Sequence, residues 1–546
     1  MKDKSKFSLT KKSFVDVVLV IFLLSFITTA QASSGSDLPK VQNYDLVVYG
    51  GSPAGVMAAI AAKREGLNVV LIAQGRTVGG SISNGLGATD LTQTDILTAL
   101  PLEFFKAVQA SYHNSDTLRV TPKRAEYIFR KMLRNEKVDF HLNVPITEAT
   151  VTNNSITCLI GASQDNWCAK EFIDASYMGD LLPLTNTAFH LGREDFYSYG
   201  DYKYLNYAFR VILTLPPNLT QIEKESLGSL PFMQHPTSLE PGSVKFTSGM
   251  PSFTYRFCIT TGKKQRPFRI YDEDLKYIPA WKVIAKAFYK KGCPDCENTS
   301  DRKITRFWRI VKVAGNKWDL NSLNSFTNFP MPEDYFTDPS TQAGYNLQAA
   351  HYIESLMAYL QGPNGPIKTE KMAAAGFGVC SDEFVDNDNI PYEPYIREGR
   401  RIVGQSTLLA SDELTGSTQP DSIGLAKYPL DNKMSISIQF GTRLFRDFTN
   451  FVNSRVYEVP FSITVPKNGL SNLLVPIAVS TSPLAYGSMR MEPHYMSLGQ
   501  ATGIAAALAI NDQVPVQQIP IKKLQNVLVS WGQKLHQSWA EHHYGN

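Results

Sequence analysis

The feature that most constrains the fold is a glycine-rich turn between an apolar segment and an Ala-rich segment. Residues 44–49 are apolar and β-branched, which indicates a buried parallel strand. They run directly into Gly50-Gly51-Ser52-Pro53-Ala54-Gly55, and residues 56–65 then favour a helix that ends at Gly66. Residues 69–72 predict the next strand. A strand, a glycine turn, a helix and a strand within about 30 residues are typical of an α/β sheet that binds a dinucleotide.

Each position of the turn has a physical reason. Gly50 permits the tight bend, a small residue at Ser52 lets the backbone approach a pyrophosphate, and Gly55 lets the helix pack closely on the strand. The pyrophosphate would lie at the positive helix N-terminus, beside Pro53 and Ala54. The alternative is a glycine turn that serves only packing.

Two positions depart from the usual fingerprint. Ser52 replaces the middle glycine, but it is small and carries a hydroxyl group. Ala73 ends the second strand, where an acidic residue usually binds the ribose hydroxyls. Gln74 is the neighbouring side chain that could form those hydrogen bonds instead.

A second glycine cluster follows the second strand. We expect its backbone to lie against a flat, extended ligand, because residues without side chains allow such an approach. A nicotinamide enzyme does not need this cluster, so it favours a flavin dinucleotide. The expected contacts are Gly79, Gly80, Ser81, Gly85 and Gly87.

Residues 1–32 predict an export signal. Lysines in residues 2–12 precede an apolar run over 17–27 and the small-x-small sequence Ala30-Gln31-Ala32. The run is shorter than the roughly 20 residues of a membrane span. We therefore expect an exported protein, periplasmic or secreted, with no stable membrane span after cleavage. A retained N-terminal anchor is the alternative.

The charge of the chain bears on its partners. The formal net charge is +4, and most of it lies within residues 1–32. The near-neutral remainder lacks the clustered Lys and Arg on which nucleic-acid binding depends, so no nucleic-acid partner is expected.

Six cysteines are present, and an oxidising compartment would allow some of them to pair. Cys293 and Cys296 form a Cys-x-x-Cys motif, but no second Cys or His pair lies at zinc-binding spacing, so no metal is predicted. A redox dithiol, a structural disulfide or idle thiols remain open for this pair.

Four blocks resemble the FAD-dependent oxidoreductases of the glutathione-reductase-like superfamily, and within it a bacterial xanthan-lyase-like group. Met178 stands where that family has an acidic residue. The blocks are residues 48–90, residues 172–181 with 192–194, residues 395–404, and residues 472–476 with 489–496 and 498–507.

The resemblance implies FAD as the cofactor and an α/β fold. The expected architecture is a discontinuous Rossmann-like FAD/NAD(P)-binding domain with an inserted mixed α/β substrate domain. The expected boundaries are a signal peptide over 1–32, the first part of the FAD domain over 33–195, the inserted domain over 196–390, and the return to the FAD domain over 391–546.

The later blocks supply further expected cofactor contacts. In the family, the strand that ends at Ala175 returns beside the cofactor, followed by Gly179 and Asp180. Small residues at the start of a helix over 499–510 would leave room for a flat ring, and the positive helix end would stabilise negative charge on a reduced flavin. The alternative is an Ala-rich core helix. The residues concerned are Gly499, Gln500, Ala501 and Gly503.

Candidate catalytic residues lie in the last two blocks. Arg397 and Arg401 would share a face of a strand and could bind a carboxylate or an oxyanion, unless they pair with Glu398 in an exposed cluster. Arg490 and His494 precede the helix, and His494 is the expected general acid or base because its ordinary pKa lies near 6.5. A hydrogen bond from His494 to backbone is the alternative.

These features predict an exported FAD-dependent oxidoreductase that transfers a hydride from a small organic or sugar-like substrate to flavin N5. Residues 376–381 carry two glycines but no strand-helix frame, so we expect a loop there rather than a second nucleotide site. The electron acceptor therefore stays open. The alternatives are a secreted binding protein without redox activity and a polysaccharide-lyase-like activity.

Overall fold

A computed structural model describes the chain over residues 41–89, 94–113, 118–192, 199–204, 210–234, 252–290, 297–300, 302–305, 307–322, 325–365, 376–433, 437–446 and 449–537. The predicted signal peptide lies outside the described residues, as do Cys293 and Cys296. Within the described ranges, no helix has the length and apolar character to cross a membrane.

The first sheet has seven strands in the order β3-β2-β1-β6-β5-β4, with β27 paired to β6. Strands β1, β2, β3, β6 and β27 run parallel to one another, whereas β5 pairs antiparallel with β6 and β4 pairs antiparallel with β5. The strands are β1 (Val41–Tyr49), β2 (Val69–Ala73), β3 (Asp139–Leu142), β4 (Ile146–Thr152), β5 (Ser155–Gly161), β6 (Asn166–Asp174) and β27 (Leu473–Leu474).

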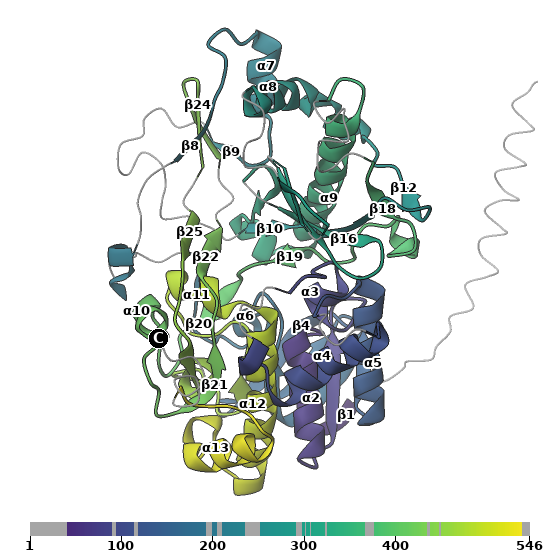
Figure 1. Ribbon diagram of the computed structural model, residues 1–546. Coiled ribbons are helices and arrows are strands. Elements are labelled where there is room, and N and C mark those ends of the chain that lie inside the picture. The colour runs from purple at the N-terminus through teal and green to yellow at the C-terminus, as the bar shows by residue number, and fades with distance from the viewer. Residues whose placement is uncertain are drawn as a thin grey trace, which may run out of the picture. The chain divides into compact units, whose positions relative to one another are not determined.

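Helix α2 (Pro53–Arg64) follows the glycine turn, as the sequence predicts, and packs against α12 (Glu492–Asp512) from the far end of the chain (Figure 1). Small residues allow this close approach: a Cβ added to Gly499 would lie 2.7 Å from the carbonyl carbon of Ala54. Helices α4 (Ala99–Ser111) and α5 (Pro122–Asn135) complete the apolar core on this side.

A second apolar core gathers buried side chains between Leu213 and Leu444. It includes a seven-stranded antiparallel sheet in the order β12-β18-β11-β16-β15-β14-β13, with helices α8 (Ile278–Tyr289) and α9 (Pro339–Gln361). The strands are β11 (Phe257–Thr260), β12 (Gln265–Arg266), β13 (Glu297–Asn298), β14 (Arg302–Ile304), β15 (Trp308–Lys312), β16 (Lys317–Ser322) and β18 (Gly378–Cys380).

The expected loop over residues 376–381 is in part a strand. β18 lies between β12 and β11 and pairs with both, because Val379 and Cys380 are apolar and fully buried. These glycines are not part of a strand–turn–helix unit that could bind a nucleotide, because β18 is a short antiparallel strand inside this sheet.

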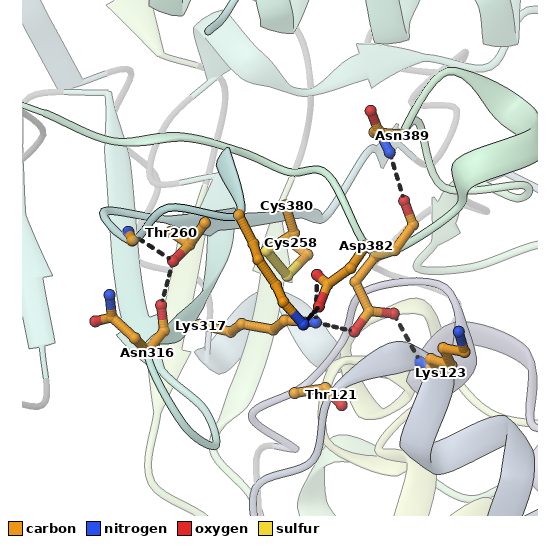
Figure 2. The surroundings of a disulfide bond; sticks show 12 residues. Thr121, Lys123, Cys258, Thr260, Asn316, Lys317, Cys380, Asp382 and Asn389 are labelled. Carbon is orange, nitrogen blue, oxygen red and sulfur yellow. Dashed lines mark hydrogen bonds and ion pairs between the residues drawn. A yellow bond between two sulfur atoms is a disulfide. The ribbon is translucent and has the colours of Figure 1, made fainter. Parts of the chain in front are cut away.

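Among the described residues, two disulfides connect neighbouring strands. Cys158 and Cys168 join β5 to β6, and Cys258 and Cys380 join β11 to β18. Figure 2 shows the second bond beside Lys317, whose ammonium group lies 2.8 Å from Asp382 Oδ1.

The same surroundings connect the two cores. Lys317 Nζ lies 2.5 Å from Glu383 Oε1, and the backbone N–H of Lys123 at the start of α5 donates to Glu383 Oε2 at 2.9 Å (Figure 2). A buried carboxylate therefore links α5, which packs on the first sheet, to the second sheet.

Shorter elements complete the chain. The remaining helices are α3 (Gly80–Ser83), α6 (Leu181–Leu184), α7 (Gln221–Gly228), α10 (Ala410–Thr415), α11 (Pro483–Met489) and α13 (Ile521–Ser530). The remaining strands are β7 (Phe189–Leu191), β8 (Arg210–Thr214), β9 (Met233–Gln234), β10 (Ser252–Thr254), β17 (Phe329–Pro330), β19 (Tyr395–Ile396), β20 (Arg400–Ile402), β21 (Ser422–Ala426), β22 (Leu430–Lys433), β23 (Ser437–Phe440), β24 (Arg443–Arg446), β25 (Thr449–Val452) and β26 (Tyr457–Pro460).

Candidate functional site

A cavity of about 310 Å³ lies at the carboxyl ends of β1, β2 and β6. Residues 49–52, 73–77 and 175–178 form one wall, directly after the three strands. The opposite wall comes from the second core, chiefly Tyr335, Gln342 and residues 392–394. Open α/β sheets bind ligands at this edge, so the position of the cavity is that of a ligand site.

The glycine turn forms the floor of the cavity. Gly50 has a φ of +118°, and a Cβ there would lie 2.6 Å from the backbone nitrogen of Ser176, so only glycine fits. The Ser52 hydroxyl caps α2 by accepting from the Gly55 N–H at 3.1 Å, and it donates to the Ala175 carbonyl at 2.8 Å. Ser52 therefore fixes the helix start to the end of β6.

The expected cofactor residues of the first two blocks separate into two groups. Six line the cavity: Gly50, Ser52, Gln74, Gly80, Ala175 and Asp180. The expected residues that do not line it and are buried beside it are Pro53, Ala54, Gly55, Gly79, Ser81, Gly85, Gly87 and Gly179.

Several of these expected glycines, Gly179 among them, pack against protein. A Cβ on Gly87 would lie 2.6 Å from the Val120 carbonyl oxygen, and one on Gly179 would lie 2.7 Å from Leu182 Cδ1. A Cβ on Gly85 would overlap the Arg256 carbonyl. These glycines permit tight packing between segments, where the sequence suggested contact with a flat ligand.

A second cavity of about 450 Å³ shares six lining residues with the first, so the two adjoin. Asp180 lines both, and its nearer carboxylate oxygen lies 4.0 Å from Arg400 Nη1. Burial raises the pKa of Asp180, and Arg400 opposes that shift. Met178, where the family has an acidic residue, also lines both cavities.

Tyr177 closes one side of the first cavity. Its hydroxyl accepts from the Ser81 N–H at 2.9 Å and donates to Glu492 Oε1 at 2.7 Å. Tyr177 thereby joins the start of α3 to the start of α12. Burial raises the pKa of Glu492 to about 7.

The helix expected over 499–510 begins earlier, at Glu492. Gly499 is therefore in the helix interior, and Gly503 lies one turn further on. The backbone of Ala58 on α2 occupies the space where a side chain at position 503 would lie. Gln500 is fully buried, and its Oε1 accepts from the Leu100 N–H at 2.9 Å. Ala501 is also fully buried. None of these four lines either cavity, and they pack as an Ala-rich core helix does.

Arg397 and Arg490 meet at Tyr395. Arg490 Nη1 donates to the Tyr395 hydroxyl at 2.9 Å, while the Arg397 guanidinium lies over the Tyr395 ring at 5.1 Å. A third arginine, Arg256, lies over the same ring at 5.2 Å and pairs with Asp319.

Arg397 is the least satisfied of these cations. Its Nη1 makes one long hydrogen bond to Ser252 Oγ at 3.4 Å, and its buried Nη2 has no partner in the described part of the chain. Burial lowers the pKa of Arg397 to about 10, and the like charges of Arg490 and Arg256 add to that shift. Among the expected catalytic arginines, Arg397 therefore keeps an N–H without a partner in the described residues, and it lines neither cavity.

Each guanidinium nitrogen of Arg401 has a partner within the protein. Its Nη1 and Nη2 donate to the carbonyls of Thr481 and Gly192 at 2.6 and 2.7 Å, and its Nε pairs with Glu398 at 2.9 Å. The pairing with Glu398 matches the alternative interpretation of this cluster, although Arg401 is buried rather than exposed.

His494 lies in the first turn of α12, 3% exposed and away from both cavities. Its Nε2 accepts from the backbone N–H of Lys427 at 3.3 Å. Burial lowers its pKa to about 4, so the ring is neutral near pH 7. The alternative interpretation, a hydrogen bond to backbone, describes this histidine.

Sequence reasoning missed the wall from the second core. Tyr335, Gln342, Asn346 and residues 392–394 line the first cavity, yet they lie far from the glycine turn in the sequence. The sequence could have indicated Gly51 and Gly75 as cavity residues, because both are next to residues expected to contact the cofactor. Nothing in the sequence connects Glu393 to the end of β2.

The comparisons with known proteins come from a family model and from solved structures. The model for FAD dependent oxidoreductases matches residues 45–528. A search of curated proteins found no match.

Three solved structures illustrate the similarity. A bacillithiol disulfide reductase from Staphylococcus aureus shares 18% identity, over 28% of this chain and 43% of that one, with a TM-score of 0.21. A flavin-containing monooxygenase from Stenotrophomonas maltophilia shares 13%, over 29% and 44%, with a TM-score of 0.21. THI4 from Thermovibrio ammonificans shares 12%, over 34% and 76%, with a TM-score of 0.21. The chain spans less than half the length of the first two proteins.

Proposed function

Because the chain belongs to the FAD-dependent oxidoreductase family, it is an oxidoreductase with FAD as its cofactor, and we propose that it is exported and oxidises a small organic or sugar-like substrate by hydride transfer. The observation that carries the proposal is the cavity at the carboxyl ends of β1, β2 and β6, with the glycine turn as its floor. Bound FAD would supply the hydride acceptor.

The residues around the cavity fit the nucleotide half of FAD. Gly50 and Gly51 line the cavity, and neither carries a side chain that could block the approach of a ligand to the backbone. The turn leads into α2, a helix of 12 residues whose N-terminus is positive. The backbone of residues 50–52 would hold the pyrophosphate, and residues 74–76 would lie along the adenosine.

Arg397 would bind an anionic group of the substrate. A buried guanidinium with an unpartnered N–H is costly unless a ligand accepts from it, and a carboxylate or oxyanion is the matching acceptor. Arg397→Gln should raise KM for an acidic substrate and leave the flavin spectrum of the holoenzyme unchanged. Equal KM values for variant and wild type would remove Arg397 from this role.

The two disulfides support export, because such bonds persist mainly in oxidising compartments. The second apolar core supports an inserted domain that faces the cofactor across the cavity. The boundaries at 33–195, 196–390 and 391–546 and membership of the xanthan-lyase-like group stay predictions.

The test is a visible spectrum of the purified protein before and after acid precipitation. Bands near roughly 370 and 450 nm that move to the supernatant would establish non-covalent flavin, and colour in the pellet would establish a covalent link. Loss of the longer-wavelength band under anaerobic conditions then identifies substrates. A protein that stays colourless after incubation with FAD would overturn the proposal and favour a binding protein that only keeps the fold.

A further inference from the structure

The end of β2 lacks a carboxylate in the sequence but has one in the structure. In dinucleotide-binding sheets, an acidic residue at this strand end binds the ribose hydroxyls, and here that position is Ala73. Glu393, from the segment just before β19, lines the cavity together with Ala73, Gln74 and Gly75. A residue far away in the sequence therefore brings a carboxylate to the expected place.

Gly75 and Glu393 are matched in shape. A Cβ added to Gly75 would overlap Glu393 Oε1 and would lie 2.7 Å from the carboxyl carbon of Glu393. Gly75 does not have a positive φ, so its backbone conformation does not require glycine. A side chain at position 75 would instead displace the Glu393 carboxylate from its place. This packing holds the carboxylate two residues beyond Ala73.

The Glu393 carboxylate has no donor of its own. Within the described ranges, no hydrogen bond or ion pair reaches it. The groups that face it are the Glu126 carboxylate on α5 and the Tyr255 phenol, and neither offers a positive charge. Arg76 lines the same cavity, but it pairs with Asp386 at 2.6 Å and lies over the Tyr392 ring at 4.6 Å.

Burial and the like charge of Glu126 raise the pKa of Glu393 to about 7. Removing a carboxylate from water without a compensating donor is unfavourable, and a ligand with hydroxyl groups would relieve that cost. A vicinal diol offers two O–H donors, one for each carboxylate oxygen.

We propose that Glu393 binds the 2′- and 3′-hydroxyls of the adenosine ribose of FAD, in place of the acidic residue that Ala73 lacks. The inference rests on the proposed function, in that FAD must bind in this cavity. Gln74, which the sequence suggested for this task, would then be a neighbour of the ribose rather than its main acceptor.

The test compares two ligands that differ only in the diol. The full-length chain, freed of flavin, is titrated calorimetrically with ADP and with 2′,3′-dideoxy-ADP. Glu393→Gln keeps the shape but replaces one acceptor oxygen with a donor, so ADP should bind about ten- to a hundredfold more weakly. Binding of dideoxy-ADP should be the same in variant and wild type.

Glu126→Gln is the matched control. It removes the neighbouring carboxylate, which pairs with Arg130 on α5 and does not line the cavity. ADP should bind to this variant as tightly as to the wild type, or slightly more tightly, because the repulsion on Glu393 is reduced.

The wild type alone gives a second measurement that does not depend on a variant folding. The ratio of the ADP and dideoxy-ADP affinities should rise as the pH increases through about 7, since the ionised Glu393 accepts hydrogen bonds from both hydroxyls. Both ligands carry the same phosphates, so phosphate titration cancels in the ratio.

The outcomes separate the two proposals. If Glu393→Gln weakens both ligands equally, or neither, or if the wild-type ratio does not change with pH, the role of Glu393 is overturned while FAD binding stands. A wild type that binds neither FAD nor ADP overturns the proposed function, and this inference with it.

Discussion

Glu171 lies within β6, next to the first strand, with its carboxyl group buried. Its Oε2 has no hydrogen-bond partner in the described part of the chain, and burial raises its pKa to about 9. The folded state therefore keeps this carboxyl protonated at pH values where the unfolded chain ionises it.

The sign of the resulting pH effect follows from that difference. The stability associated with protonated Glu171 is fully present below its unfolded pKa and is lost as the pH rises through its folded pKa of about 9. Glu171→Gln removes the titration. The variant should gain stability over the wild type as the pH rises, by about 1–3 kcal/mol at the alkaline end. Urea unfolding between about pH 5 and about pH 9 measures the difference, and a gap that is constant over this range would contradict it.

The residue scale also shows what the sequence could and could not predict. The roles of Gly50 and Gly55 follow from chemistry that any such turn imposes. The side chains of His494 and Arg401 suit catalysis, yet burial keeps the histidine neutral near pH 7 and the arginine donates to backbone carbonyls. Burial depends on segments distant in the sequence, so neither outcome is visible in the local motif.

At the scale of elements, the contact between α2 and α12 depends on small residues. Gly499 and Gly503 lie one turn apart on α12. The backbone of α2, at Ala54 and Ala58, occupies the space where their side chains would lie. Adding a methyl group to either would force the two helices apart.

Gly503→Ala should therefore lower the free energy of unfolding by about 1–3 kcal/mol through overpacking. Gly344→Ala is the matched control, since Gly344 lies in α9 with open space around its missing Cβ. There the same substitution should stabilise by up to about 1 kcal/mol, because alanine is the better helix former. Thermal melts of the two variants should move in opposite directions, and a shift of the same sign in both would refute the packing argument.

The start of α12 was readable from the sequence. Glu492 and Pro493 occupy its first two positions, and an acidic residue with a proline in the first turn is a helix-start signal. The family resemblance instead predicts a helix over 499–510 that starts at the glycines. Their role could not be settled without the partner helix, because small residues serve a ligand and a close helix contact equally well.

At the scale of the whole molecule, the two disulfides close loops of very different length. Cys158 and Cys168 are 10 residues apart, whereas Cys258 and Cys380 are 122 residues apart. If a disulfide stabilises mainly by restricting the unfolded chain, the longer loop contributes more.

The double variant Cys258→Ala/Cys380→Ala should lose about 4–5 kcal/mol, and Cys158→Ala/Cys168→Ala about 2–3 kcal/mol. Urea midpoints of the two variants, measured without reductant, test the order. Equal losses, or a larger loss for the short loop, would show that strand pairing and packing, rather than loop length, set the stability at these sites.

The pairing of β27 with β6 has a consequence for how the protein is made. Asn472 donates to the Lys170 carbonyl, 302 residues earlier, and Leu473 then pairs with Phe172. The nucleotide-binding sheet cannot be completed until the ribosome has synthesised nearly the whole chain. Contacts so distant form slowly. Completion of this sheet is therefore a late step in the folding of the chain.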